Sequence, residues 1–221
     1  MIEKNYESIK RRVADSAKAA GRSPDSVKLV AVSKGRSAEE IGQLAKIGQK
    51  IFGESRSDEL EEKYGKVKGV EWHFVGHLQS NKCREIVEHC SLIHSVDSIK
   101  LLQKIQNVAR ELDKKQKVLL EVNVSGEESK YGFSAAEVAV VLDRIGQLPF
   151  GNVEVLGFMA IGPNTSDKEL VEKAFGEVHG LAEDYKFREL SMGMSNDFEI
   201  AVRNGATFVR IGRALFGKVE T

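Results

Sequence analysis

The stretch Val27-Lys28-Leu29-Val30-Ala31-Val32-Ser33-Lys34 decides the fold class of this chain. It is a short, nearly continuous apolar run that ends in a lysine, and it predicts a buried strand over 27–33. A helix is expected directly after it, over 37–47, because Ser37 and Glu40 have the spacing of a capping box. A buried strand that leads at once into a helix is the unit from which parallel α/β sheets are built.

The same unit recurs along the rest of the chain. Eight strands are expected, each followed by a helix, and one extra helix over 3–20 precedes them. Eight units favour a single closed (β/α)₈ TIM barrel, whereas the alternative, an open doubly wound sheet, usually has about five or six strands. No linker or internal repeat interrupts the pattern, so one domain is expected over 1–221. The expected strands cover 27–33, 50–53, 71–75, 91–96, 117–124, 153–160, 189–191 and 207–211.

Composition excludes several classes of function. The 33 basic and 33 acidic residues among 221 balance, which argues against general binding of nucleic acid or of anionic membranes. The N-terminal residues do not resemble a signal peptide, and no stretch approaches the ~20 apolar residues of a membrane span, so a cytoplasmic protein is expected. Cys83 and Cys90 are expected to be reduced thiols, and no metal-ligand spacing is present. No exposed apolar stripe is evident, which favours a monomer.

Candidate functional residues follow from the barrel. In this fold the active face is built from residues at the carboxyl ends of the strands. A lysine there can attack an aldehyde and hold it as an imine, and burial makes such an amine available by disfavouring its charged form. The alternative for Lys34 is a strand-end lysine that only reaches solvent. The residues expected at the strand ends are Lys34, Ser55, His77, Asp97, Asn123, Met159, Ser191 and Arg210.

A second feature is a pair of glycine turns late in the chain. In 191–195 Gly193 would let the backbone approach a ligand, and Ser195 is expected to cap the next helix, where backbone N–H groups favour an anion. Gly212 supplies another turn after the last strand, and barrels often bind phosphate with the loops after strands seven and eight. Ordinary helix capping is the alternative. A lysine beside a phosphate site indicates a phosphorylated aldehyde, with pyridoxal 5'-phosphate (PLP) as the first candidate and an aldolase that forms a lysine imine as another.

The remaining polar positions are less specific. Arg210 lies within an apolar run and needs a buried partner, and Arg213 is expected at the surface or near the phosphate. His77 is either an acid/base or a polar rim residue. Asn123 is a plausible hydrogen-bonding ligand to a pyridine substituent, and Lys130 lies on a long loop of the kind that often carries function.

Several motifs together resemble one protein family over nearly the whole chain. The chain resembles the YggS/PROSC family of PLP-binding homeostasis proteins, which are similar in fold to the barrel domain of alanine racemase. No one of the motifs would suffice alone. The segments that carry the resemblance are 31–34 (AVSK), 73–82 (HFVGHLQSNK), 123–132, 157–160 (GFMA), 190–195 (LSMGMS) and 209–217 (VRIGRALFG).

The resemblance implies a role for each matched position. Lys34 would carry PLP as a Schiff base. Arg210 would face the pyridine nitrogen and leave the ring neutral, which makes it a weak electron sink. The phosphate would lie near Ser195, Gly193, Gly212 and Arg213. The other expected cofactor-binding residues are Ser55, Asn123, Met159, Ser191 and Met194.

The function implied is intracellular PLP (vitamin B6) homeostasis by a carrier or regulator without catalytic turnover, with PLP-dependent apo-enzymes as possible recipients. A PLP-dependent racemase or lyase is the alternative; it needs a base, for which His77 is the candidate, because the second domain that supplies the racemase base is not expected here. Two positions depart from the family pattern. Gly35 stands where threonine is common and Ser55 where asparagine is usual, so the affinity for PLP and the contacts to its ring could differ from those of the family.

Overall fold

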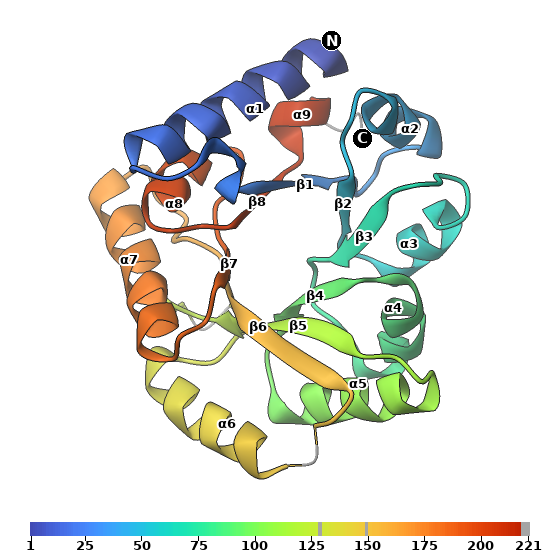
Figure 1. Ribbon diagram of the computed structural model, residues 1–221, viewed down its shortest axis with the longest axis vertical. Helices are drawn as coiled ribbons and strands as arrows, with labels where there is room; N and C mark the ends of the chain where they lie inside the picture. Colours follow the sequence, from blue (N-terminus) through green and yellow to red (C-terminus); the bar gives the residue numbers. More distant parts are fainter. Residues whose placement is uncertain (128–129, 149, 218–221) are drawn as a thin grey trace.

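A computed structural model of the chain describes residues 1–127, 130–148 and 150–217, and within them the expected strands close into one barrel (Figure 1). All neighbouring strands are parallel, in the order β1 to β8, and β8 pairs with β1. The closed (β/α)₈ barrel predicted from the sequence is therefore confirmed. The strands are β1 (Lys28–Val32), β2 (Ile51–Glu54), β3 (Glu71–Phe74), β4 (Leu92–Val96), β5 (Gln116–Val122), β6 (Val153–Ala160), β7 (Glu189–Ser191) and β8 (Phe208–Ile211).

Helices surround the barrel on its outside (Figure 1). The extra helix at the N-terminus packs across α8 and α9 through a buried face of Tyr6, Ile9, Val13 and Ala17. The described helices are α1 (Ile2–Ala19), α2 (Ala38–Lys46), α3 (Ser57–Lys63), α4 (Cys83–His89), α5 (Ile99–Glu111), α6 (Ala135–Gln147), α7 (Lys168–Asp184), α8 (Phe198–Arg203) and α9 (Arg213–Phe216), with short 3₁₀ turns η1 (Pro24–Ser26) and η2 (Ser80–Lys82).

Side chains of β1 alternate between two apolar cores. Leu29 and Ala31 pack outward against the helices, whereas Val30 belongs to a cluster inside the barrel. Because strand side chains alternate with a period of two, Val32 at the end of β1 continues the inward series, and Lys34 follows in the turn at the mouth. The interior cluster consists of Val30, Leu92, Leu119, Met159 and Phe208.

Element boundaries differ from the sequence prediction at one place that matters for the site. The helix expected to begin at Ser195 begins at Phe198, and Asp197 occupies the N-cap position. The prediction that Ser195 caps this helix is therefore wrong. The capping box predicted at Ser37 and Glu40 is present, with both of its hydrogen bonds.

Candidate functional site

Lys34 stands in the turn that follows β1, at the mouth of the barrel. The sequence left open a buried amine and a lysine that reaches solvent; the strand ends at Val32 and Lys34 is exposed, so its side chain reaches solvent. Gly35 continues the turn with a φ of 68°, a left-handed conformation that glycine adopts without strain. The exposed amine can reach a ligand that lies across the mouth.

A buried charged cluster holds this turn from the outer side of β1. Lys63 donates hydrogen bonds to the Ser33 carbonyl at 2.9 Å, to Glu54 at 2.8 Å and to Glu59 at 2.7 Å. Glu59 in turn accepts from the backbone N–H of Gly35 at 2.6 Å. Burial raises the pKa of the Glu54 carboxyl, while hydrogen bonds from Lys63 and Ser33 oppose that rise. Both neighbours of the mouth lysine are thus fixed by one cluster.

Gly193 is buried in the loop after β7 and has a φ of 89°. A Cβ at this position would lie 2.6 Å from the Ala201 Cβ and 2.7 Å from the Phe198 Cα. The glycine is therefore required because the loop packs tightly on α8. This packing fixes the direction in which the loop leaves the sheet.

Ser195 joins the two glycine turns. Its hydroxyl accepts a hydrogen bond from the backbone N–H of Ala214, in the first turn of α9, at 3.3 Å. The loop after β7 therefore meets the loop after β8, as the sequence predicted. Asp197 accepts from the N–H of Met194 at 2.5 Å and closes the first loop on itself. Arg213 is the exposed first residue of α9.

Gly212 brings this pair of loops close to β1. A Cβ on Gly212 would lie 3.0 Å from the carbonyl oxygen of Val32, the last residue of β1. Lys34 follows two residues later. The lysine and the two loops are thus neighbours across the β8–β1 side of the mouth.

Arg210 is buried inside the barrel on β8 and is 5% exposed. It donates to the carbonyl and the hydroxyl of Ser191, each at 2.7 Å, and to the carbonyl of Ala160 at 3.0 Å. Burial lowers the pKa of the guanidinium to about 10, so it remains a cation at neutral pH. The prediction that this inward arginine finds buried partners is confirmed.

Glu121 is a buried carboxyl that the sequence reasoning missed. Burial raises its pKa to about 7, while the positive charge of Arg210 opposes that rise and the negative charge of Asp97 adds to it. The signal was available, because an acidic residue interrupts the apolar strand 116–122 at an inward position.

A cavity of about 170 Å³ opens at the mouth beside β5 and β6. The Lys130 ammonium bridges Glu127 at 2.6 Å and the Gly162 carbonyl at 3.1 Å, and so ties the loop after β5 to the loop after β6. The residues that line the cavity are Glu121, Val122, Asn123, Lys130, Tyr131 and Ile161.

Three further residues that the sequence predicted for the site, Asn123, Met159 and Ser55, lie in different surroundings. Asn123 lines the cavity, but its amide donates to the carbonyls of Glu127 at 3.0 Å and Lys130 at 3.2 Å, so it organises its own loop. Met159 belongs to the interior cluster and is 1% exposed. Ser55 follows β2, and its backbone packs so closely against Gly76 that a Cβ there would lie 2.3 Å from the Ser55 oxygen.

His77 lies on the rim of the mouth, with 39% of its side chain exposed. Its Nδ1 is 3.1 Å from the Asp97 carboxylate, and its ring stacks on Tyr131 with centroids 3.9 Å apart. The carboxylate is placed to accept a hydrogen bond from Nδ1–H and so to orient the ring. This geometry suits a rim residue and is also compatible with proton transfer.

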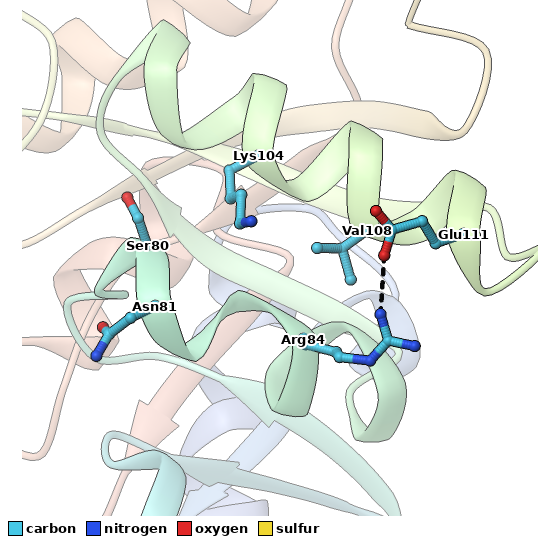
Figure 2. Close-up of a pocket in the computed structure, with 6 residues that line it drawn as sticks. All are labelled: Ser80, Asn81, Arg84, Lys104, Val108 and Glu111. Atoms are coloured by element: carbon cyan, nitrogen blue, oxygen red, sulfur yellow. Dashed lines mark hydrogen bonds and ion pairs between the residues drawn. The ribbon is translucent and has the colours of Figure 1, made fainter.

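A larger cavity, of about 350 Å³, lies away from the barrel mouth between η2, α4 and α5 (Figure 2). Arg84 and Glu111 form an ion pair of 2.8 Å at one end of it. None of the residues predicted for the site lines it. Its lining residues are Ser80, Asn81, Arg84, Lys104, Val108 and Glu111.

Neither a metal site nor a membrane span is present in the described ranges. No group of three or more His, Cys, Asp or Glu side chains there is placed to hold a metal ion. None of the helices in these ranges has the length and apolarity needed to span a membrane. Cys83 and Cys90 are buried free thiols, and burial raises the pKa of Cys83 to about 11.

Comparison with known proteins gives consistent results. Residues 2–219 match the family model of the alanine racemase N-terminal domain. The pyridoxal phosphate homeostasis protein of Pseudomonas aeruginosa is 38% identical over 220 residues, which cover 98% of this chain and 95% of the relative. That of Escherichia coli K12 is 34% identical and covers 98% of this chain and 96% of the relative.

Solved structures agree on the fold. PipY of Synechococcus elongatus PCC7942 with PLP bound is 34% identical, has a TM-score of 0.81, and is covered over its full length by 93% of this chain. Alanine racemase of Clostridium difficile 630 is 15% identical with a TM-score of 0.72. That likeness concerns the fold alone, and 57% of the racemase chain is covered.

Proposed function

Because the chain belongs to the family of the pyridoxal phosphate homeostasis proteins, built on the alanine racemase N-terminal domain, we propose that it binds PLP at the barrel mouth and serves in PLP homeostasis. The role is that of a carrier or regulator without catalytic turnover. The observation that carries the proposal is the meeting of the two glycine turns, joined by Ser195 and Ala214, beside the exposed Lys34.

The donor set at the mouth fits PLP. Lys34 offers a primary amine for the aldehyde. The Ser195 hydroxyl already accepts from Ala214, so its own proton remains available to a phosphate, and the exposed Arg213 directly precedes Ala214 in the chain. Arg210 presents a buried guanidinium, which can donate hydrogen bonds but cannot accept them.

Each residue then has a definite task. The Lys34 amine attacks the aldehyde carbon, water leaves, and a C=N bond holds the ligand until water or another amine reverses the step. Ser195 and the backbone of the two turns orient the phosphate. Arg210 donates to the pyridine nitrogen and does not protonate it, because its own pKa stays near 10. When bound, PLP supplies the aldehyde and a ring that is a weak electron sink in this setting.

A PLP-dependent racemase or lyase is the second candidate, and one observation favours it. His77 is oriented by Asp97 at the rim, where it could move a proton. The neutral ring imposed by Arg210 argues against this candidate, because a carbanion on such a ring is poorly stabilised. The aldolase alternative uses the same lysine and loops, and the family relationship favours PLP over it.

The proposal also covers the cellular compartment, the oligomeric state and the recipients of PLP. We place the protein in the cytoplasm as a monomer of one barrel domain that exchanges PLP with PLP-dependent apo-enzymes. The free thiols of Cys83 and Cys90 are in keeping with a reducing compartment.

The experiment is PLP uptake by the purified protein, followed by borohydride reduction and peptide mapping. The wild type should gain the visible absorption band of a PLP Schiff base and carry the adduct on Lys34. Lys34→Ala should lose both. Lys28→Ala is the matched control, because Lys28 is the first residue of β1, at the end of the barrel opposite Lys34, where it pairs with Glu189 at 3.2 Å. A wild type that takes up no PLP contradicts the proposal.

A further inference from the structure

A network of hydrogen-bonded polar side chains crosses the barrel interior from the mouth to the opposite end. Arg210 donates to the Ser191 hydroxyl at 2.7 Å, which lies 2.8 Å from Nδ1 of His94. Nε2 of His94 lies 2.9 Å from Nδ1 of His73, and Nε2 of His73 lies 3.2 Å from the Glu71 carboxylate. Four successive contacts thus connect a cation at the mouth to an anion at the amino end of β3.

The polar hydrogens of this network can be placed in only one way when both imidazoles are neutral. A hydrogen bond from His73 holds the pKa of Glu71 at about 2, so the carboxylate is ionised and only accepts. A neutral His73 then donates from Nε2 and accepts at Nδ1, which makes Nε2 of His94 the donor and Nδ1 of His94 an acceptor. The Ser191 proton goes to His94. The Ser191 oxygen is left to accept from Arg210.

The surroundings keep both imidazoles neutral and fixed. His73 is 1% exposed and His94 fully buried, and burial lowers the pKa of each ring. The Phe208 ring packs edge-on against both, with centroids 5.6 Å away in each case. The charges of Lys28 and Glu189 face His73 from the same end of the barrel as Glu71. Because Nε2 of the neutral His94 donates to His73, its Nδ1 can only accept from Ser191.

We propose that His94 is a positioning residue for the ligand: acting through Ser191, it fixes the Arg210 guanidinium so that the remaining N–H donors of Arg210 face the pyridine nitrogen. The inference rests on the proposed function, since it concerns the same site. His94 does not touch the ligand. It removes the Ser191 proton from the mouth and so makes the Ser191 oxygen an obligatory acceptor for the arginine.

The test compares PLP binding by His94→Leu, His94→Gln and the wild type, with the ¹⁵N resonance of ring-labelled PLP as a second readout. Leucine removes the acceptor for Ser191, and we expect PLP to bind about tenfold more weakly, as for loss of one hydrogen bond to a charged group, with a shifted pyridine ¹⁵N resonance. Glutamine offers one acceptor and one donor and should restore both values. His89 stacks on Tyr64 and is not part of this network, so His89→Leu should match the wild type in both PLP affinity and the ¹⁵N resonance.

A second variant covers the case in which His94→Leu does not fold. Ser191→Ala removes one oxygen, breaks the same link and should shift the ¹⁵N resonance in the same direction. If the wild type binds PLP and both variants keep its affinity and its ¹⁵N resonance, the inference is overturned and the proposed function stands. If the wild type binds no PLP, the proposed function fails, and this inference fails with it.

Discussion

The Lys63 ammonium lies 2.9 Å from the carbonyl oxygen of Ser33, the residue directly before Lys34. Lys63 is 4% exposed and approaches the turn from α3, on the outer side of the barrel wall. Lys34 lies in the turn after β1 and is exposed at the mouth. One lysine therefore holds the backbone of the turn, while the other remains available for chemistry.

Lys63→Met should strongly destabilise the fold. The substitution leaves the Glu54 carboxylate, whose side chain is fully buried, without its cation, and removing one partner of a buried ion pair costs about 3–5 kcal/mol. The loss should be smaller at acidic pH, because burial already raises the pKa of Glu54 and the carboxyl can take up a proton. Urea unfolding at two pH values measures both effects.

Lys66→Met is the matched control for that prediction. Lys66, in the turn after α3, pairs with Glu62 of that helix at 3.3 Å, but the two side chains are 57% and 71% exposed. An exposed pair contributes about 0–1 kcal/mol, so the free energy of unfolding should hardly change. Equal losses in the free energy of unfolding would show that burial of the Lys63 cluster does not increase its contribution to stability.

The sequence predicted the barrel because two of its patterns are local. Apolar runs of strand length alternate with helix signals such as Ser37 and Glu40, and each pattern depends on neighbouring residues only. The meeting of the two glycine turns was also predicted, since the ends of adjacent parallel strands must share one edge. The pairing of β8 with β1 and the contact between the loops after β7 and β8 therefore followed from the order of the strands.

The partners of those residues could not be predicted in the same way. Whether Ser195 caps a helix or accepts from Ala214 depends on where α8 begins, and it begins three residues later than its sequence suggests. The exposure of Lys34 depends on β1 ending at Val32, and boundaries are set by tertiary contacts such as that of Lys63 with Ser33. Long-range polar pairs leave no periodic signal.

Glu121→Gln should make the protein more stable at alkaline pH. Burial raises the pKa of Glu121 from 4.5 to about 7, so between these values the folded protein holds a proton that the unfolded chain has lost. The free energy of unfolding therefore falls as the pH rises through this window, by up to about 3 kcal/mol. The variant escapes this loss and should exceed the wild type by that amount at pH ~8, with little difference near pH ~4.5.

Urea unfolding of both proteins across this pH range provides the measurement. Glu111→Gln is a suitable control, because Glu111 is 59% exposed and its pairing with Arg84 lies at the surface. Its effect on stability should stay small over the window, because an exposed ion pair contributes about 0–1 kcal/mol. A constant difference between Glu121→Gln and the wild type would mean that the Glu121 carboxyl titrates at its ordinary pKa.

Gly193→Ala should destabilise the fold far more than Gly21→Ala. Both glycines have a positive φ, 89° and 69°, so both variants bear the strain of a left-handed alanine, of order 1 kcal/mol. A Cβ at Gly21 meets nothing within 4 Å, whereas one at Gly193 would lie 2.6 Å from the Ala201 side chain. The difference in melting temperature between the two variants isolates this packing term. Similar values would show that the loop after β7 can move away from α8 without loss of stability.

The carrier role predicts that the PLP-loaded protein does not labilise the α-proton of amino acids. Arg210 keeps the ring neutral, and His77 is tied to Asp97 and stacked on Tyr131 at the rim. Loaded wild type incubated with alanine in D₂O should therefore exchange the α-proton no faster than the same concentration of free PLP, as followed by ¹H NMR. His77→Ala should leave that rate unchanged. Rapid exchange in the wild type that disappears in His77→Ala would establish the racemase or lyase alternative, because it would assign proton transfer to the one imidazole that Asp97 orients at the mouth.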